Sequence, residues 1–150
     1  MIYIASDHGG FKLKEAILKF LFSQKIKFTD LGPVKFEPAD DYPDFAKVAA
    51  KAVAKHPTQN IGILMCRSGQ GMCIAANKVK GIRAASVWNE KLARTARNDD
   101  MANIICLASD YLSAKEAKKI VKIFINTPFS KAVRHIRRIN KIKELESAKS

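Results

Sequence analysis

Cys66, Arg67 and Ser68 follow an apolar run and precede two spaced glycines, Gly69 and Gly71. Glycines permit backbone conformations in which successive N–H groups converge on an anion or oxyanion. A thiol placed before such amides and beside a cation is in a setting that stabilises a thiolate, which can act as a nucleophile or base. The stretch therefore suggests an anion-binding turn with a reactive thiol. A simple chain reversal beside an inert core cysteine remains the alternative.

Two other groups of residues could bind or transfer charge. Asp7 and His8 follow the short apolar stretch at residues 1–5 and suit acid–base chemistry or anion contact. A turn-capping aspartate with a surface histidine is the alternative. Arg134 and Arg138 are one helical turn apart, so they can bind the oxygens of one phosphate from the same helix face. A solvated basic face is the alternative, and it is favoured unless another feature supports a phosphate.

The three cysteines, Cys66, Cys73 and Cys106, are odd in number and have no C-x-x-C spacing. This pattern indicates free thiols and gives no sign of a disulfide framework or a zinc site. Cys73 and Cys106 lie inside apolar patterns, and we expect both in the core.

Hydrophobic periodicity alternates between strand and helix along the chain. Ser113 and Glu116 have capping-box spacing at one helix start, and Thr127 with Pro128 interrupts the last helical pattern. The expected strands cover residues 1–5, 26–32, 60–66, 82–87 and 103–108, and the expected helices cover about 11–24, 42–56, 71–78, 89–99, 113–126 and 129–147.

Apolar strands that alternate with helices predict a parallel sheet covered on both faces. The fold class is therefore α/β: a Rossmann-like three-layer αβα sandwich with a five-stranded parallel sheet and an extended basic C-terminal helix. We expect one domain over residues 1–150. In such sheets ligands bind at the carboxyl ends of the strands. That rule predicts that SDHGG, CRSGQG and the region after SVW are neighbours.

The formal net charge is +13, and residues 76–150 carry 17 Lys and Arg against 7 Asp and Glu. This bias is compatible with nucleic acid, a membrane surface or small anions, so charge alone favours none of these partners. The basic residues are mostly scattered along amphipathic helices, as on an ordinary solvated surface. No apolar run reaches the roughly 18 residues of a membrane span, and no signal peptide is evident, which predicts a cytoplasmic location.

Five segments together resemble the ribose 5-phosphate isomerase B family, which also includes subunits of galactose 6-phosphate isomerase. They are ASDHGGFKLK, DYPDFA, ILMCRSGQGMCIAANKVKGIRAA, NDDMAN and VRHIRR, in the family's order over nearly the whole chain. The SGQGMCIAANKVKGIRA block is the most specific of them.

The resemblance implies an aldose–ketose isomerase of phosphorylated sugars that works through a cis-enediolate and needs no metal or organic cofactor. It implies a homodimer or homotetramer with shared active sites, acting on ribose 5-phosphate in the pentose phosphate pathway. The expected partner is a small phosphorylated sugar, not nucleic acid or a membrane. A hexose or tetrose phosphate substrate, and a binding subunit with weakened catalysis, are the alternatives.

Residue by residue, the resemblance implies that Cys66 is the base that moves a proton between C1 and C2. Some relatives use instead a Glu six residues later, where this chain has Met72. Ser68 would orient the base or a sugar oxygen, and the amides from Ser68 through Gly71, including Gly69, would stabilise the enediolate. Asp7 would assist ring opening or bind a sugar hydroxyl. The expected phosphate ligands are His8, Arg134 and Arg138.

Three positions depart from the family pattern. Relatives usually have Gly at Arg67, and often an Arg at Asp110. Their HNDAN segment is NDDMAN here, so the ring-opening His is absent. Alignment on Asn103 places Asp99 at that His and Asp100 at the following Asn, whereas a one-residue insertion would keep Asn98 and Asp99 in register. We expect Asp99 to replace the His, Asp100 and Asn103 to contact substrate, and Arg67 to replace the missing phosphate ligand.

Overall fold

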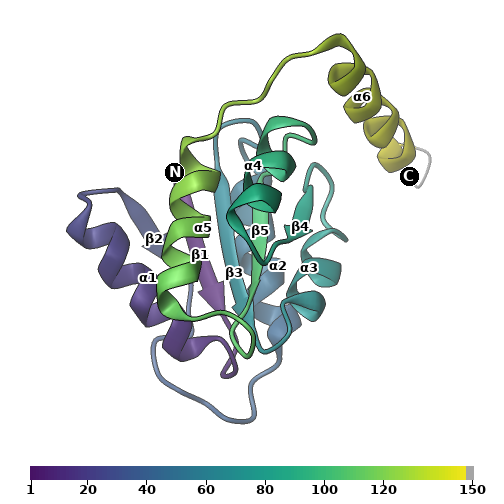
Figure 1. The fold of residues 1–150 in the computed structure, drawn as a ribbon. Helices are drawn as coiled ribbons and strands as arrows, with labels where there is room; N and C mark the ends of the chain where they lie inside the picture. The colour runs from purple at the N-terminus through teal and green to yellow at the C-terminus, as the bar shows by residue number, and fades with distance from the viewer. Residues whose placement is uncertain (148–150) are drawn as a thin grey trace.

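A computed structural model describes residues 1–147 (Figure 1). Residues 148–150, the end of the expected 1–150 domain, lie outside the described residues, and the single-domain assignment stays a prediction. The strands are β1 (Ile2–Ser6), β2 (Phe28–Asp30), β3 (Ile61–Cys66), β4 (Ala84–Ser86) and β5 (Ile104–Ala108). The helices are α1 (Phe11–Ser23), α2 (Tyr42–Ala54), α3 (Gln70–Ala76), α4 (Glu90–Asn98), α5 (Ala114–Asn126) and α6 (Val133–Ser147).

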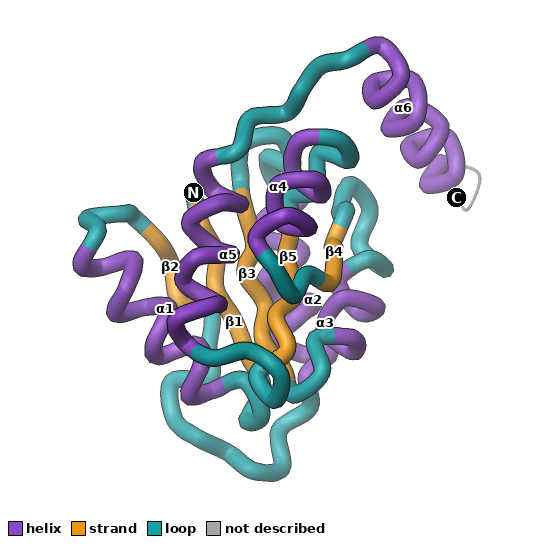
Figure 2. Tube along the Cα trace, in the orientation of Figure 1, coloured by secondary structure: helices purple, strands orange, loops and turns teal. Residues whose placement is uncertain are grey.

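The five strands form one parallel sheet in the order β2-β1-β3-β5-β4 (Figure 2). The helices cover both faces of this sheet, so the predicted Rossmann-like three-layer fold is confirmed. β2 lies on one side of β1, and β3 with the later strands lies on the other side. This reversal between β1 and β3 is a topological switch point, where open α/β sheets bind ligands beyond the carboxyl ends of their strands.

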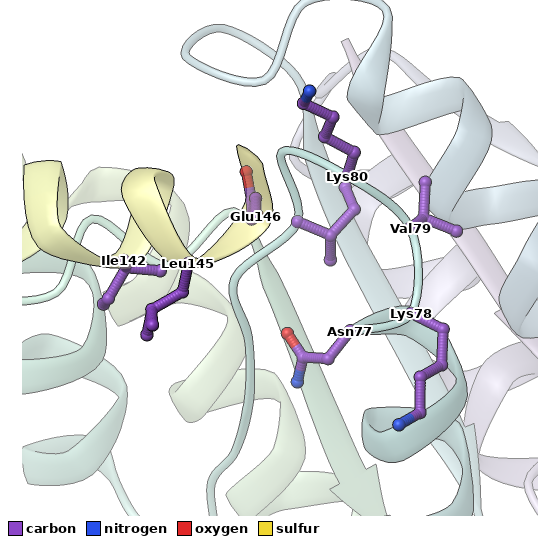
Figure 3. Close-up of a pocket in the computed structure, with 8 residues that line it drawn as sticks. Asn77, Lys78, Val79, Lys80, Ile142, Leu145 and Glu146 are labelled. Carbon is purple, nitrogen blue, oxygen red and sulfur yellow. The ribbon is translucent and has the colours of Figure 1, made fainter. Parts of the chain in front are cut away.

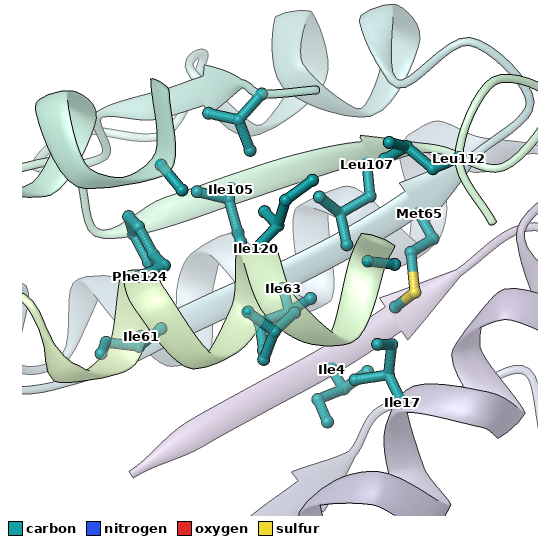
Figure 4. Close-up of a cluster of buried hydrophobic side chains, with 14 of the residues drawn as sticks. Ile4, Ile17, Ile61, Ile63, Met65, Ile105, Leu107, Leu112, Ile120 and Phe124 are labelled. Atoms are coloured by element: carbon teal, nitrogen blue, oxygen red, sulfur yellow. The ribbon is translucent and has the colours of Figure 1, made fainter. Parts of the chain in front are cut away.

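Alternate residues of the central strands are buried on opposite faces of the sheet. Ile63 and Met65 pack on the face covered by α1, α4 and α5, where Phe124 is fully buried (Figure 4). Leu64 and Cys66 pack on the other face, against the small residues of α2 and against α3. Both faces of β3 are therefore apolar, which explains why its sequence is continuously hydrophobic rather than alternating.

The local signals at several helix and strand ends are confirmed. Ser113 and Glu116 form a reciprocal capping box at α5, and Pro43 lies in the first turn of α2. All three cysteines are free; Cys106 is buried, and Cys73 packs partly buried against the same cluster.

The last helix begins at Val133, four residues later than expected. Pro128 lacks a backbone N–H and cannot continue α5, and Lys131 has a left-handed φ of 56°. The Oγ of Ser130 then accepts the N–H of Ala132 and bonds the Nδ1 of His135, which organises the start of α6. Residues 127–132 are consequently a connection that separates α6 from the helical layers.

Helix α6 extends beyond the end of the sheet at which the strands begin (Figure 1). Near its C-terminus the Oε1 of Glu146 accepts the backbone N–H of Gly81 at 3.1 Å. An open cleft of about 360 Å³ lies here, lined by Ile142 and Leu145 of α6 and by the loop at residues 77–80 (Figure 3). Within residues 1–147, no helix is long and apolar enough to cross a membrane.

Candidate active site

The ends of β1 and β3 bring the loops at residues 7–10 and 67–69 together. Ser6 pairs with Met65 in the parallel ladder, and the N–H of Asp7 continues the pairing by donating to the carbonyl of Met65. Gly10 then packs on that carbonyl so closely that a Cβ atom would collide with it. The two loops that the sequence singled out therefore lie side by side at the topological switch point.

Cys66 ends β3 with only 5% of its surface exposed. Its Sγ accepts a hydrogen bond from the backbone N–H of Gly69, at 3.1 Å. Gly69 has a φ of +74°, which lets the chain turn directly into α3 and brings this N–H back to the sulfur. The loop thus places a backbone donor directly against the sulfur atom that would take up a proton.

Ser109 joins the loops from the neighbouring strand β5. Its N–H donates to the carbonyl of Cys66 at 2.9 Å, and its Oγ lies 2.7 Å from the carbonyl oxygen of Gly9. One side chain thus fixes the loop after β3 to the loop after β1. This hydroxyl was not identified from the sequence, because its function depends on the strand order.

Asp7 is buried beneath the same loop. Its Oδ1 accepts the N–H of Gly10 at 2.9 Å, so it does cap the turn into α1. Burial raises the pKa of the Asp7 carboxyl, while the hydrogen bond from Gly10 and the charge of His8 act in the opposite direction. A carboxyl that keeps its proton to higher pH than usual is suited to general acid catalysis.

His8 lies at the mouth of the site and contacts Asp40, an acidic residue near the end of the loop between β2 and α2. Asp40 Oδ1 is 2.7 Å from the Nδ1 of His8. The hydrogen bond to Asp40 raises the pKa of His8, with a smaller contribution from the charge of Asp7. The sequence analysis did not identify Asp40, because three acids at positions 40, 41 and 44 are equally plausible partners.

Arg67 is exposed and its aliphatic stem lies against Gly9, so a Cβ atom at that glycine would displace the arginine side chain. The guanidinium pairs with Asp110. Arg67 is therefore positioned above the loop that carries Asp7 and His8.

Ser68 and the start of α3 border an open cleft of about 510 Å³, which continues between Trp88 and Tyr111. The Oγ of Ser68 faces the N–H of Gln70 at 3.4 Å. Gly71 packs against the ring of Tyr42, and a Cβ atom at this glycine would come within 2.7 Å of that ring. The amide-rich loop is thus open on the side of the cleft and closed on the side of α2.

The other predicted site residues lie at the far end of the molecule. Asp99 and Asp100 follow α4, and Arg134 and Arg138 are exposed on α6, at the end of the sheet opposite the loop of Cys66 (Figure 1). Asp99 Oδ1 is 3.8 Å from the Nδ1 of His135. Within the described residues of one subunit, these four side chains do not join the cluster around Cys66.

Asn103 is fully buried at the start of β5. Its Nδ2 donates to the carbonyls of Pro57 and Gly81, and its Oδ1 accepts the N–H of Arg83. Both amide protons are used, so the side chain holds three chain segments together, and the proposed site does not include it.

Known proteins resemble this chain over nearly its whole length. A model of the family described as ribose/galactose isomerase matches residues 2–142. The chain is 45% identical over 148 residues to a protein of Mycoplasma pneumoniae named probable ribose-5-phosphate isomerase B, covering 99% of this chain and 96% of that protein. It is 39% identical to ribose-5-phosphate isomerase B of Mycolicibacterium paratuberculosis over 97% of this chain and 91% of the relative.

Two solved structures have almost the same fold. Ribose-5-phosphate isomerase B from Mycoplasma genitalium, with bound ribulose-5-phosphate, matches with a TM-score of 0.94 and 46% identity, covering 97% of this chain and 95% of the other. Ribose-5-phosphate isomerase B from Clostridium thermocellum also has a TM-score of 0.94, with 40% identity and 99% coverage of both chains.

Proposed function

The chain belongs to the ribose/galactose isomerase family, and from this premise we propose that it interconverts ribose 5-phosphate and ribulose 5-phosphate. The observation that carries the proposal is the hydrogen bond from the Gly69 N–H to the Cys66 Sγ, at the switch point beside Asp7. The reaction moves one proton between C1 and C2 and needs a base next to a carbonyl carbon. The Cys66 sulfur, held at that place with a backbone N–H against it, meets this need.

Starting from the aldose, the Cys66 thiolate takes the C2 proton and the electrons of that C–H bond form the C1–C2 double bond of the enediolate. The same thiol then returns the proton to C1, while the hydroxyl proton of O2 passes to O1. Backbone amides from Ser68 through Gly71 stabilise the negative oxygen formed in between. Ser68 orients the sugar at the entrance to the cleft.

Ring opening precedes this step, since the sugar phosphate is cyclic in solution. The buried Asp7 carboxyl, whose pKa is raised by burial, is the group within this subunit that can give a proton to the ring oxygen. His8 and Arg67, at the rim of the same loops, bind the phosphate.

The remaining ligands come from a second copy of the chain. Asp99, Asp100, Arg134 and Arg138 lie far from Cys66 in one subunit, and α6 extends away from the sheet with Val133 and Leu145 exposed. In a homodimer, α6 and residues 99–100 of one subunit reach the site of the other subunit. Both sites are then complete. Arg134 and Arg138 then bind phosphate, and Asp99 serves as the acid–base group for ring opening.

This assembly is tested by mixing subunits. Cys66→Ala and Arg138→Ala homodimers are each expected to be nearly inactive. Random exchange of the two makes heterodimers with one intact site, so about a quarter of the wild-type rate returns. A mixture that exchanges subunits, as seen by mass spectrometry, and stays inactive contradicts shared sites.

A cytoplasmic location is part of the proposal. Three free thiols, all within the described residues, support it because unpaired cysteines persist in reducing compartments. The reaction would place the protein in the pentose phosphate pathway.

The central experiment follows deuterium entry from heavy water at C1 or C2, together with product formation, for a panel of pentose, hexose and tetrose phosphates. Wild type is expected to exchange and convert ribose 5-phosphate fastest. Cys66→Ala is expected to lose at least about a thousandfold in kcat, because it removes the group that moves the proton. Cys73→Ala, which removes a thiol from α3 outside the site, is the matched control. Exchange at the wild-type rate in Cys66→Ala refutes the assigned base, and faster turnover of a hexose or tetrose phosphate refutes the assigned substrate.

A further inference from the structure

His8 makes two contacts with one oxygen of Asp40. The Oδ1 atom accepts the backbone N–H of His8 at 2.9 Å and lies 2.7 Å from the Nδ1 of the ring. Together these contacts fix both the position of the residue and the rotation of its imidazole. The Nε2 atom, on the other side of the ring, is left for a ligand, and the side chain is 33% exposed.

Asp40 itself is poorly solvated. Its side chain is 8% exposed, and its second oxygen, Oδ2, is buried without a hydrogen-bond partner among the described residues. Within residues 1–147, His8 is the one basic side chain within 4.0 Å of this carboxylate. A buried carboxylate is costly unless an opposite charge compensates it, so Asp40 favours the imidazolium form of His8.

The loop that carries Asp40 is fixed in front of α1. Lys14 donates to the carbonyl of Pro33 at 2.8 Å, and the ring of Phe36 packs edge-on against Phe11, with centroids 6.0 Å apart. The N–H of Ser6 donates to the carbonyl of Gly32. These contacts fix residues 32–36 against β1 and α1 and so restrict the path by which the loop reaches Asp40.

We propose that Asp40 is a positioning residue that holds His8 as an imidazolium with its Nε2–H directed at the phosphate of the substrate. The inference rests on the proposed function, in which His8 is a phosphate ligand, and adds the residue that keeps this ligand charged. The charged groups that face His8 are Asp40 from the loop at residues 31–41, Asp7 from the preceding position, and Arg67, whose stem lies against Gly9.

The role predicts a pH dependence with a defined sign. Asp40 raises the pKa of His8, so the imidazolium persists to higher pH than in an ordinary histidine. Phosphate binding weakens as pH rises through this raised pKa. Asp40→Asn keeps an oxygen that can accept both N–H groups but removes the charge, so the weakening moves to lower pH.

The test combines ring titration and kinetics. The pKa of His8 is measured by NMR without substrate, with His8→Gln identifying its signal among the three histidines. Asp40→Asn is expected to lower that pKa and to raise KM for ribose 5-phosphate about tenfold at pH 8, with kcat nearly unchanged. Glu37→Gln, an exposed acid of the same loop, removes the same charge and is expected to leave both values unchanged.

A double-mutant cycle separates this role from loop folding. In a His8→Gln background, Asp40→Asn is expected to add no further rise in KM, because Asp40 acts through His8. A second rise in KM as large as the first overturns the proposal, as does a His8 pKa that Asp40→Asn leaves unchanged. Inorganic phosphate provides a readout that does not need turnover. If it shifts the His8 signal less in Asp40→Asn while no sugar phosphate is converted, the positioning role stands and the proposed reaction fails.

Discussion

Arg67 and Asp110 leave the ends of the neighbouring strands β3 and β5 and form an ion pair, with the Arg67 Nε 3.0 Å from the Asp110 Oδ2. The family resembled by the sequence usually has Gly at the first position and often an Arg at the second. The two positions that depart from the resembled pattern are therefore in contact in space. We propose that the Arg67 guanidinium takes the place of that Arg from the neighbouring loop.

This pair is expected to act on substrate binding and little on stability. The side chains are 71% and 44% exposed, and such surface pairs contribute about 0–1 kcal/mol. Arg67→Ala is expected to raise KM for ribose 5-phosphate about tenfold while the melting temperature changes by about a degree or two, as measured by steady-state kinetics and thermal unfolding. Asp110→Asn is expected to raise KM less, since the guanidinium remains but is no longer held.

Lys119 with Glu90 is the matched control, because it is also an exposed ion pair and lies outside the site. Lys119→Ala should leave KM unchanged. Substrate affinity that stays the same in Arg67→Ala would exclude this side chain as the replacement phosphate ligand.

Lys14 is expected to be the lysine on which folding depends most. Its side chain is 2% exposed, and its Nζ contacts both oxygens of Asp30, at 2.8 and 2.7 Å. Lys14→Met leaves the Asp30 carboxylate without its partner, and because that side chain is 28% exposed, the free energy of unfolding in urea should fall by about 1–2 kcal/mol. Adding Asp30→Asn should recover part of that loss, since no unpaired charge then remains.

Lys19→Met on the exposed side of α1 is the control for this substitution and should change stability by less than about 0.5 kcal/mol. Equal destabilisation by the two variants would mean that the buried ion pair contributes nothing specific. Because Lys14 also holds Pro33, the Lys14→Met variant should in addition raise KM through the loop that carries Asp40.

The fold could be predicted from the sequence because each strand carries its own evidence. Ile63 and Leu64 are adjacent and both apolar, and they belong to an apolar run that is too short for a helix. Such a run predicts a strand that is buried on both faces of the sheet. The place of the Cys66 loop could also be predicted, because the carboxyl ends of the strands in a parallel sheet meet at one edge.

Partners from distant segments could not be predicted. Arg67 and Asp110 are 43 residues apart and meet because β3 and β5 are neighbours, which the order of elements along the chain does not determine. Asp40 meets His8 because Lys14 and Phe11 fix the path of the intervening loop. Asp99 and Cys66 likewise lie at opposite ends of the sheet. The sequence pattern does not show that these two residues of one chain are separated in this way.

The Asp7 carboxyl is expected to lower the stability of the fold at neutral pH and to increase kcat. Burial raises its pKa above the ordinary 3.8, so the unfolded chain loses this proton more readily than the folded one. Ionisation of Asp7 therefore costs stability, beginning near the ordinary value and complete above the raised one. Asp7→Asn, which can still accept the Gly10 N–H, should raise the melting temperature at pH 7, with a gain that shrinks as pH falls. It should lower kcat about a hundredfold. A variant less stable than wild type at pH 7 would contradict the assigned direction.

Gly69 is expected to couple backbone conformation to the reactive thiol. Its φ of +74° is strained for any residue with a side chain, and a Cβ atom would come within 3.3 Å of the Ala108 nitrogen. Gly69→Ala should therefore cost about 1–2 kcal/mol of stability and should also turn the N–H away from the Cys66 Sγ, lowering kcat about tenfold. Gly81→Ala is the control: its φ is +82°, a Cβ atom there would make only ordinary contact with Pro57 at 3.7 Å, and it lies at the other end of the sheet. Urea unfolding should show comparable destabilisation of the two variants, whereas kcat should fall only in Gly69→Ala. If kcat fell equally in both, general loss of stability rather than the lost hydrogen bond to sulfur would be the cause.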